Sequence, residues 1–81
     1  MSGKRLLIVA HTPSSNTARL LDAVLSGAHN PNISGVETVA KSPFDTKAKD
    51  VMEAHGIILG TTENLGYMSG ALKDFFDRIY Y

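Results

Sequence analysis

The feature that most constrains this chain is a pair of aliphatic segments without any alternation of polar and apolar residues. The first is Arg5–Ala10, which reads Arg-Leu-Leu-Ile-Val-Ala, and the second is Gly56–Thr61, which reads Gly-Ile-Ile-Leu-Gly-Thr. A strand with one face in water alternates, whereas a strand covered on both faces is apolar throughout. The two segments therefore predict buried strands of a parallel sheet with helices on both sides.

Between these segments the apolar period changes to that of a helix. From Thr17 to Ala28, apolar residues recur three and four positions apart, and Asn30–Asn32, with its central proline, ends the pattern. Ile33–Ala40 then predicts a weaker strand, which suits the edge of a sheet better than its centre.

Two further helices are expected. Asp45 is the expected N-cap of a short helix whose apolar face carries Ala48, Val51 and Met52. Ser69 is the expected N-cap of the last helix, whose buried stripe consists of Leu72, Phe75, Phe76 and Ile79. Lys73 with Asp77, and Asp74 with Arg78, are expected to pair on the surface of this helix. Strand and helix alternate three times, which predicts an α/β protein with a doubly wound parallel sheet.

Ligands of such a sheet bind beyond the carboxyl ends of the strands. The loop after the first strand offers uncharged hydroxyl and amide groups, from Thr12, Ser14, Ser15, Asn16 and Thr17. The loop leads into a helix N-terminus, where free amide groups and the helix dipole favour a phosphate. An ordinary polar loop with an N-cap accounts for the same residues equally well.

The loop after the second buried strand offers more kinds of contact to a ligand than the first loop does. Gly66 allows a positive φ or a close approach to a ligand, and the side chains of Tyr67 and Met68 can lie flat against an aromatic ring. A phosphate loop together with a ring-binding loop suggests a mononucleotide. Taken singly, Tyr67 is better explained as an ordinary half-buried loop aromatic, and Met68 as a filler of the core.

Several protein classes are excluded. The formal charge is zero, so the basic surface that binds nucleic acid is not expected. With 43% hydrophobic and 20% charged residues the chain is not disordered, and without Cys it has neither disulfides nor thiol chemistry. No dinucleotide G-x-G-x-x-G or P-loop G-K-[ST] motif is present, and no metal cluster is evident. The longest aliphatic run, Leu6–Ala10, is too short to span a membrane, so a cytoplasmic location is expected.

The segment from the second buried strand onward resembles the flavodoxin-like family. After Gly56–Thr61 comes Gly66–Arg78, with the sequence G-Y-M-S-G-A-L-K-D-F-F-D-R. It is similar to the G-x-M-S-G-x-L-K-x-F-x-D-R helix start of the NAD(P)H-dependent FMN reductase and NAD(P)H:quinone oxidoreductase branch. Thr12–Thr17 is similar to the family's phosphate loop. The resemblance implies that residues 1–81 form the N-terminal half of one flavodoxin-like domain, with three strands in the order 2-1-3, three helices, and the last two strands missing.

The resemblance also implies that FMN is the cofactor. Its phosphate would be held by Thr12, Ser14, Asn16 and Thr17, with Ser15 where the family often has Gly. Its isoalloxazine ring would lie against Glu63, Asn64, Leu65, Gly66, Tyr67 and Met68. Two positions depart from the family pattern: Thr62 stands where Pro is usual, and Leu65 stands near where an aromatic residue often packs on the flavin.

By the same resemblance, the implied function is an FMN-dependent NAD(P)H oxidoreductase, or the FMN-binding part of one. Its acceptor would be a small molecule such as a quinone, a second flavin or a nitro compound, and the chemistry belongs to the cofactor, so no side chain is named as catalytic. Zero net charge favours this function over a flavodoxin-type electron carrier, since carriers of that type are usually acidic. The carrier, and a non-catalytic half-domain that has lost flavin binding, remain alternatives.

A flavodoxin-like sheet has five strands. Here the third strand would lie at an edge although its sequence is that of a doubly covered strand, and such an edge invites pairing or aggregation. We expect the edge to be covered by the remainder of a longer chain or by association into a homo-oligomer; a poorly folded fragment is the third possibility.

Overall fold

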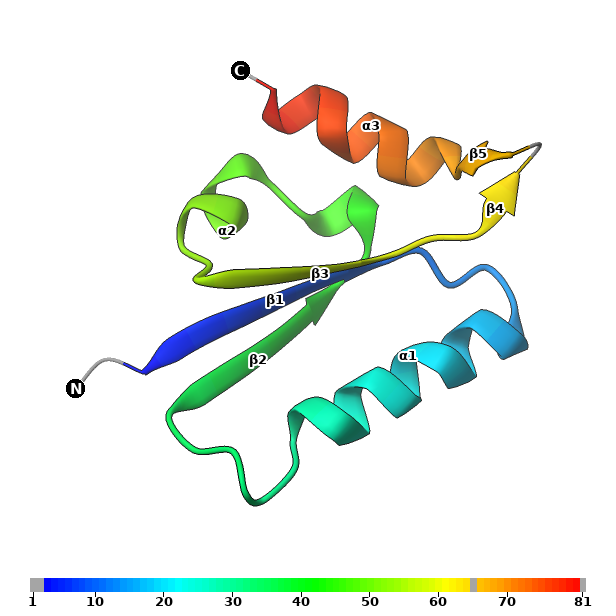
Figure 1. Ribbon diagram of the computed structural model, residues 1–81. Coiled ribbons are helices and arrows are strands. Elements are labelled where there is room, and N and C mark those ends of the chain that lie inside the picture. Colours follow the sequence, from blue (N-terminus) through cyan, green and yellow to red (C-terminus); the bar gives the residue numbers. More distant parts are fainter. Residues whose placement is uncertain (1–2, 65, 81) are drawn as a thin grey trace.

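A computed structural model describes residues 3–64 and 66–80 of the protein (Figure 1). The elements in chain order are β1 (Lys4–Ala10), α1 (Ser15–Ala28), β2 (Val36–Lys41), the 3-10 helix η1 (Pro43–Asp45), α2 (Ala48–Met52), β3 (Gly56–Gly60), β4 (Glu63–Asn64), β5 (Tyr67–Met68) and α3 (Gly70–Ile79). β1 pairs in parallel with both β2 and β3, in the order β2-β1-β3, and β4 and β5 form a small antiparallel hairpin. This confirms the predicted α/β doubly wound fold, with a flavodoxin-like strand order.

Helices lie on both faces of the sheet. α1 lies along one face, and α2 and α3 lie on the other (Figure 1). Strand β1 is central, and the side chains of Leu7, Ile8 and Val9 are fully buried. Leu7 and Val9 form the main core with Leu72 and Phe75 of α3. The absence of polar residues in β1 is thus explained by cover on both faces.

The α1 face of the sheet is covered less completely than the α3 face. No residue of α1 is buried, and Leu20, on its apolar stripe, is 68% exposed. Ile58 of β3, which lines the cavity between α1 and the sheet, is also exposed. The helical period of α1 was correctly predicted, yet part of its apolar stripe stays in contact with water.

Three local predictions were wrong. The second strand begins at Val36 rather than Ile33, because Gly35 takes a positive φ of 75° and interrupts the extended backbone. Asp45 does not cap a helix: it ends η1, and Ser42 is the N-cap there. Met52 is 85% exposed, because α2 has only five residues and ends at this position.

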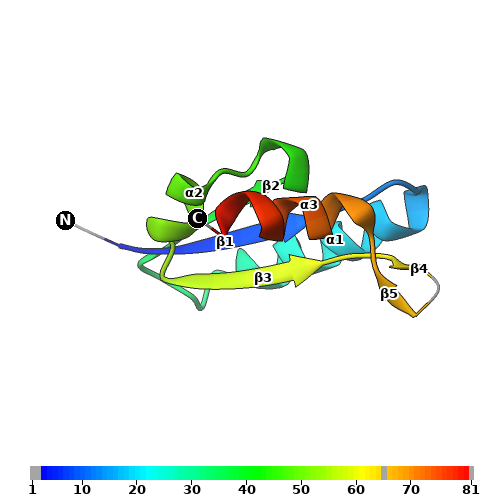
Figure 2. The ribbon, with the colours of Figure 1, turned by 90° about the horizontal axis from the view of Figure 1, so that it is seen from above.

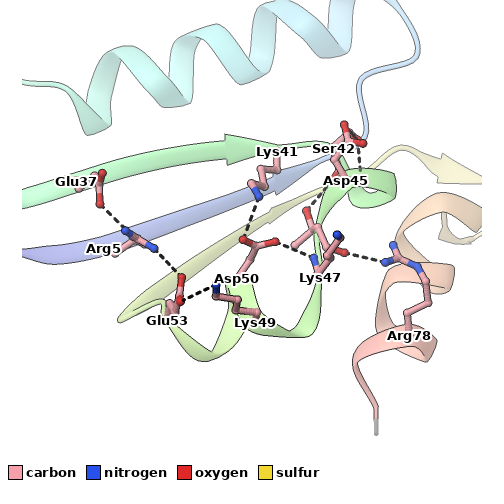
Figure 3. A network of polar contacts seen from close by, with 11 residues as sticks. Arg5, Glu37, Lys41, Ser42, Asp45, Lys47, Lys49, Asp50, Glu53 and Arg78 are labelled. Carbon is pink, nitrogen blue, oxygen red and sulfur yellow. Dashed lines mark hydrogen bonds and ion pairs between the residues drawn. The ribbon is translucent and has the colours of Figure 1, made fainter.

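A network of ion pairs joins β1, β2 and α2 on the α2 side of the sheet (Figure 3). The Arg5 guanidinium contacts both Glu37 and Glu53 at 3.0 Å, and hydrogen bonding to Glu37 raises the pKa of Arg5. Asp50 accepts hydrogen bonds from the Lys47 amide at 2.8 Å and from the Lys41 ammonium at 3.0 Å. The first of these, followed by the second, lowers the pKa of Asp50.

Arg78 connects α3 to the segment between β2 and α2 (Figure 3). Its guanidinium donates to the carbonyl oxygens of Thr46, at 2.7 Å, and Pro43. It also pairs with Asp74 one turn earlier, at 2.7 Å. The expected helix-surface pairs Arg78–Asp74 and Lys73–Asp77 are both present.

Within residues 3–64 and 66–80, no helix has the length and hydropathy needed to cross a membrane.

Candidate functional site at the carboxyl edge of the sheet

The two polar loops begin side by side at the carboxyl edge of the sheet. β1 and β3 are neighbours in parallel register, and Ala10 pairs with Gly60 at their ends. The His11 amide donates to the Gly60 carbonyl oxygen at 3.0 Å, which ties the starts of both loops together. The N-terminus of α1 and the β4–β5 hairpin lie at this same end of the molecule (Figure 1). The prediction that both loops leave the same sheet edge is confirmed.

The first loop ends in a reciprocal capping box at the start of α1. The Ser14 hydroxyl accepts from the Thr17 amide at 3.3 Å, and the Thr17 hydroxyl oxygen accepts from the Ser14 amide at 3.1 Å. Helix α1 therefore begins at Ser15, two residues before the apolar pattern starts. No acidic residue lies in the first turn, so no carboxylate opposes an anion there.

Arg19 is a contributor to this loop that the sequence pattern did not single out. Its guanidinium donates to the Asn16 side-chain oxygen at 2.6 Å. A positive charge is thereby held beside a loop whose other side chains are neutral. The three-residue spacing between Asn16 and Arg19 was the available signal, since such pairs meet on one face of a helix.

The second loop is a hairpin rather than an irregular loop. Glu63 pairs with Met68 and Asn64 with Tyr67, and the turn places Gly66 at a φ of 80°. The Glu63 carboxylate accepts from the Gly66 amide at 2.7 Å and so closes the turn. Leu65 lies outside the described residues.

Thr61 anchors the base of this hairpin. Its hydroxyl donates to the Thr62 carbonyl oxygen and accepts from the Ser69 amide, both at 2.9 Å. Ser69 is buried and caps α3 by accepting from the Leu72 amide at 3.3 Å. The end of β3 and the start of α3 are thereby held together, so the hairpin projects from a fixed base.

The hairpin side chains differ in exposure. Tyr67 is 55% exposed, which leaves its ring accessible to a ligand at the sheet edge. Met68 is half-buried and packs against the core of Leu7, Val9, Leu72 and Phe75. Thr62 is half-buried. Packing of Met68 in the core agrees with the interpretation of this residue as a core filler.

A cavity of about 140 Å³ lies between α1 and the sheet, directly below both loops. Its wall is apolar, with Ile8, Ala10, Leu20, Leu21, Val24 and Ile58 among its residues. His11, Thr12, Thr17 and Thr61 provide polar groups at its rim. Pockets that enclose drug-sized ligands measure about 300–1,000 Å³. The cavity is therefore smaller than the pockets that enclose a ligand of nucleotide size.

The Nδ1 nitrogen of the His11 side chain is buried and has no hydrogen-bond partner among the described residues. The ring meets Phe44 edge to face, with centroids 6.2 Å apart. An unpaired buried nitrogen is unusual in a folded protein, so a group from outside these residues would find a partner here.

Comparison with known proteins agrees with this architecture. No family model matches the chain. The chain is similar to the flavodoxin of Aquifex aeolicus (strain VF5), with 29% identity over 75 residues. The match covers 93% of this chain, both loops included, and 40% of that flavodoxin, so the chain spans less than half the length of its relative.

The similarity to this flavodoxin agrees with the α/β fold and the strand order 2-1-3. No cluster of three or more His, Asp or Glu residues suited to a metal occurs in the described part of the chain.

Proposed function

We propose that this chain is the FMN-binding part of a flavodoxin-type electron carrier. The observation that carries the proposal is the meeting of two dissimilar loops at one sheet edge, joined by the His11–Gly60 hydrogen bond. One loop offers neutral donors at a helix N-terminus and the other offers an exposed tyrosine beside a glycine turn. The similarity to a flavodoxin over 93% of the chain favours this function over the reductase.

The donor chemistry of the first loop fits a phosphate. In this proposal Thr12, Ser14, Ser15, Asn16 and Thr17 hold it through hydroxyl groups and the first amides of α1. The Ser14 and Thr17 hydroxyls already bond one another, so the loop is shaped before the ligand arrives. Arg19 adds a charge one turn along the helix.

The hairpin would provide the surface for the flavin ring. Thr62, Glu63, Asn64, Leu65, Gly66, Tyr67 and Met68 are the residues assigned to it. Bound FMN would supply electron-transfer chemistry, which no side chain of this segment supplies itself. The chain would bind and orient it, and the Glu63–Gly66 hydrogen bond would fix the turn against which the ring lies.

A second candidate is the NAD(P)H-dependent FMN oxidoreductase. The segment Gly66–Arg78 favours it, because its sequence resembles the helix start of that branch, and the neutral net charge agrees. A third is a half-domain without flavin binding, whether it belongs to a longer chain or is completed by other copies. The small cavity and the departures at Thr62 and Leu65 favour that third candidate.

Flavin fluorescence separates the three functions. We expect FMN fluorescence to be quenched on titration with the chain, and S14A and T17A to weaken binding about tenfold each, the loss of roughly one hydrogen bond to a charged group. S26A, at an exposed position near the other end of α1, is the matched control. Thermal melts of all variants show whether the cap, rather than the ligand contact, was lost.

Each outcome selects one function. Quenching without NADH or NADPH oxidation in the presence of a quinone supports the carrier. Quenching with rapid oxidation of either nucleotide supports the reductase. No quenching by folded chain contradicts flavin binding by residues 1–81.

A further inference from the structure

At the amino ends of β1 and β3, a histidine side chain takes the place of a backbone carbonyl. α2 leads into the amino end of β3, at the end of the sheet away from the β4–β5 hairpin (Figure 2). The paired register of β1 and β3 begins at Leu6 and Gly56, so Arg5 lies one residue outside it. The Arg5 amide nevertheless has an acceptor, because it donates to the Nδ1 nitrogen of His55 at 2.9 Å.

The contact between these two residues is reciprocal. The His55 amide donates to the Arg5 carbonyl oxygen at 2.8 Å, so both backbone polar groups of Arg5 are bonded to one residue. Arg5 belongs to β1, and His55 belongs to the connection between α2 and β3. The pair therefore extends the contact between the two strands by one step, and half of that step depends on a side chain.

The imidazole can accept the Arg5 amide in only one charge state. A neutral imidazole with its proton on Nε2 has a lone pair on Nδ1, whereas both nitrogens of an imidazolium are donors. Protonation would set the Nδ1–H of His55 against the N–H of Arg5, so the bond is lost and the ring turns away. Histidine is also the side chain that changes charge between about pH 5 and 8.

From this geometry we propose that His55 is a pH-sensitive latch between the amino ends of β1 and β3. The neutral side chain holds the Arg5 amide, and the protonated side chain releases it. His55 also lines the groove at this end of the sheet, together with Lys4, Ile33 and Val36. Release therefore loosens one wall of this groove and adds a positive charge beside Lys4.

The charges around the latch do not replace the lost bond. The titratable groups on the surrounding elements are Lys4 and Arg5 of β1, Glu37 of β2, Lys49 and Glu53 of α2, and His29 at the end of α1. Both carboxylates in this set already contact the Arg5 guanidinium, each at 3.0 Å. An imidazolium at position 55 thus joins a group in which cations outnumber carboxylates.

Hydrogen exchange of the Arg5 amide tests the latch directly. In the ¹⁵N-labelled wild type, we expect the protection of this amide, relative to an unstructured chain at the same pH, to fall about fivefold between about pH 8 and about pH 5, as loss of one hydrogen bond predicts. H55N keeps an acceptor oxygen near the position of Nδ1 and does not titrate. Its Arg5 amide should stay protected at both pH values.

Two further variants complete the series. H55A removes the acceptor, so its Arg5 amide should lack protection at both pH values. H29N replaces the histidine at the end of α1 and should behave as the wild type. Urea unfolding gives a second readout: the wild type and H55N should have equal midpoints at about pH 8, and the wild type should have the lower midpoint at about pH 5. Circular dichroism melts confirm that each variant is folded.

Three results overturn the inference. Protection of the Arg5 amide that does not change with pH in the folded wild type would show that protonation leaves the bond intact. An equal loss of protection in H55N would assign the pH response to another group. Protection in H55A equal to that of the wild type would show that the imidazole is not the acceptor. FMN takes no part in these measurements, so their outcome is independent of the proposed flavin site.

Discussion

At the scale of single residues, polar side chains fix the loops by bonding to backbone groups. Arg78 holds the carbonyls of Thr46 and Pro43, and Glu63 holds the Gly66 amide. Sequence spacing predicted the Arg78–Asp74 pair, since i,i+4 neighbours meet on any helix. It did not predict the bonds to Thr46 and Pro43, because those lie 32 and 35 residues away and depend on how α3 packs.

Arg78 should matter more for stability than its partial exposure suggests. We expect R78Q to lower the free energy of unfolding by about 1–2 kcal/mol, because two carbonyls lose a charged donor. R19Q, which loses one bond to Asn16 in its own helix, is the comparison and should cost under about 0.5 kcal/mol. Urea unfolding measures both. Equal losses in the two variants would show that Arg78 does not secure the η1 segment.

Asp50 should make stability depend on pH at the acidic end. Its pKa is lowered from 3.8, first by the Lys47 amide and then by Lys41. A lowered pKa in the folded state adds stability that is complete above the unfolded value and lost as pH falls through the folded value. D50N should therefore destabilise the chain at pH 7 by about 1 kcal/mol, as loss of a helix cap does.

As the pH falls through the lowered pKa of Asp50, the difference between D50N and the wild type should shrink, because the wild-type carboxyl is then becoming protonated as well. Urea unfolding at several pH values measures this. A difference that stays constant down to the lowest pH would contradict the role given to the ionised carboxylate.

At the scale of elements, the strands and helices follow from apolar period, and the exceptions have local causes. The runs around Leu7 and Ile58 predicted β1 and β3, and Ser69 was correctly identified as the cap of α3. The β4–β5 hairpin could not be predicted from period, because each strand has only two residues. It depends instead on the Glu63–Gly66 bond and on the conformation of Gly66.

Substitution of alanine for each of two glycines in this region should have opposite effects on local stability. Gly66 has a φ of 80°, which costs an L-residue about 1–2 kcal/mol, so G66A should loosen the hairpin. Gly70 begins α3 with no neighbouring atom within 4 Å of an added Cβ, so G70A should be neutral or slightly stabilising. Amide exchange at Tyr67 and Met68 reports the hairpin. Unchanged exchange in G66A would show that the turn does not need a glycine.

At the scale of the whole molecule, one face of the sheet is well packed and the other is more exposed to water. The α3 face holds the core of Leu7, Val9, Leu72 and Phe75. The α1 face and the β3 edge keep Leu20 and Ile58 in contact with water. The sequence predicted the order 2-1-3, with β2 and β3 at the two edges of these three strands. It could not predict the extent of the exposed surface, because exposure depends on which elements cover β3 and α1.

The sequence predicted where the candidate site lies, but it did not predict all of the contacts that build the site. Both loops leave neighbouring strand ends, as parallel topology requires. Arg19 and Thr61 were not singled out, because their contributions are contacts to other residues rather than motif positions. The central claim is that FMN binds where these loops meet.

Titration of the ¹⁵N-labelled chain with FMN, followed by amide chemical shifts, tests this claim most directly. We predict saturable shifts concentrated in residues 12–19 and 61–68, with none in the groove of Lys4, Ile33 and His55 at the opposite end of the sheet. Shifts confined to that groove, or no shifts at millimolar FMN with a folded chain, would contradict it.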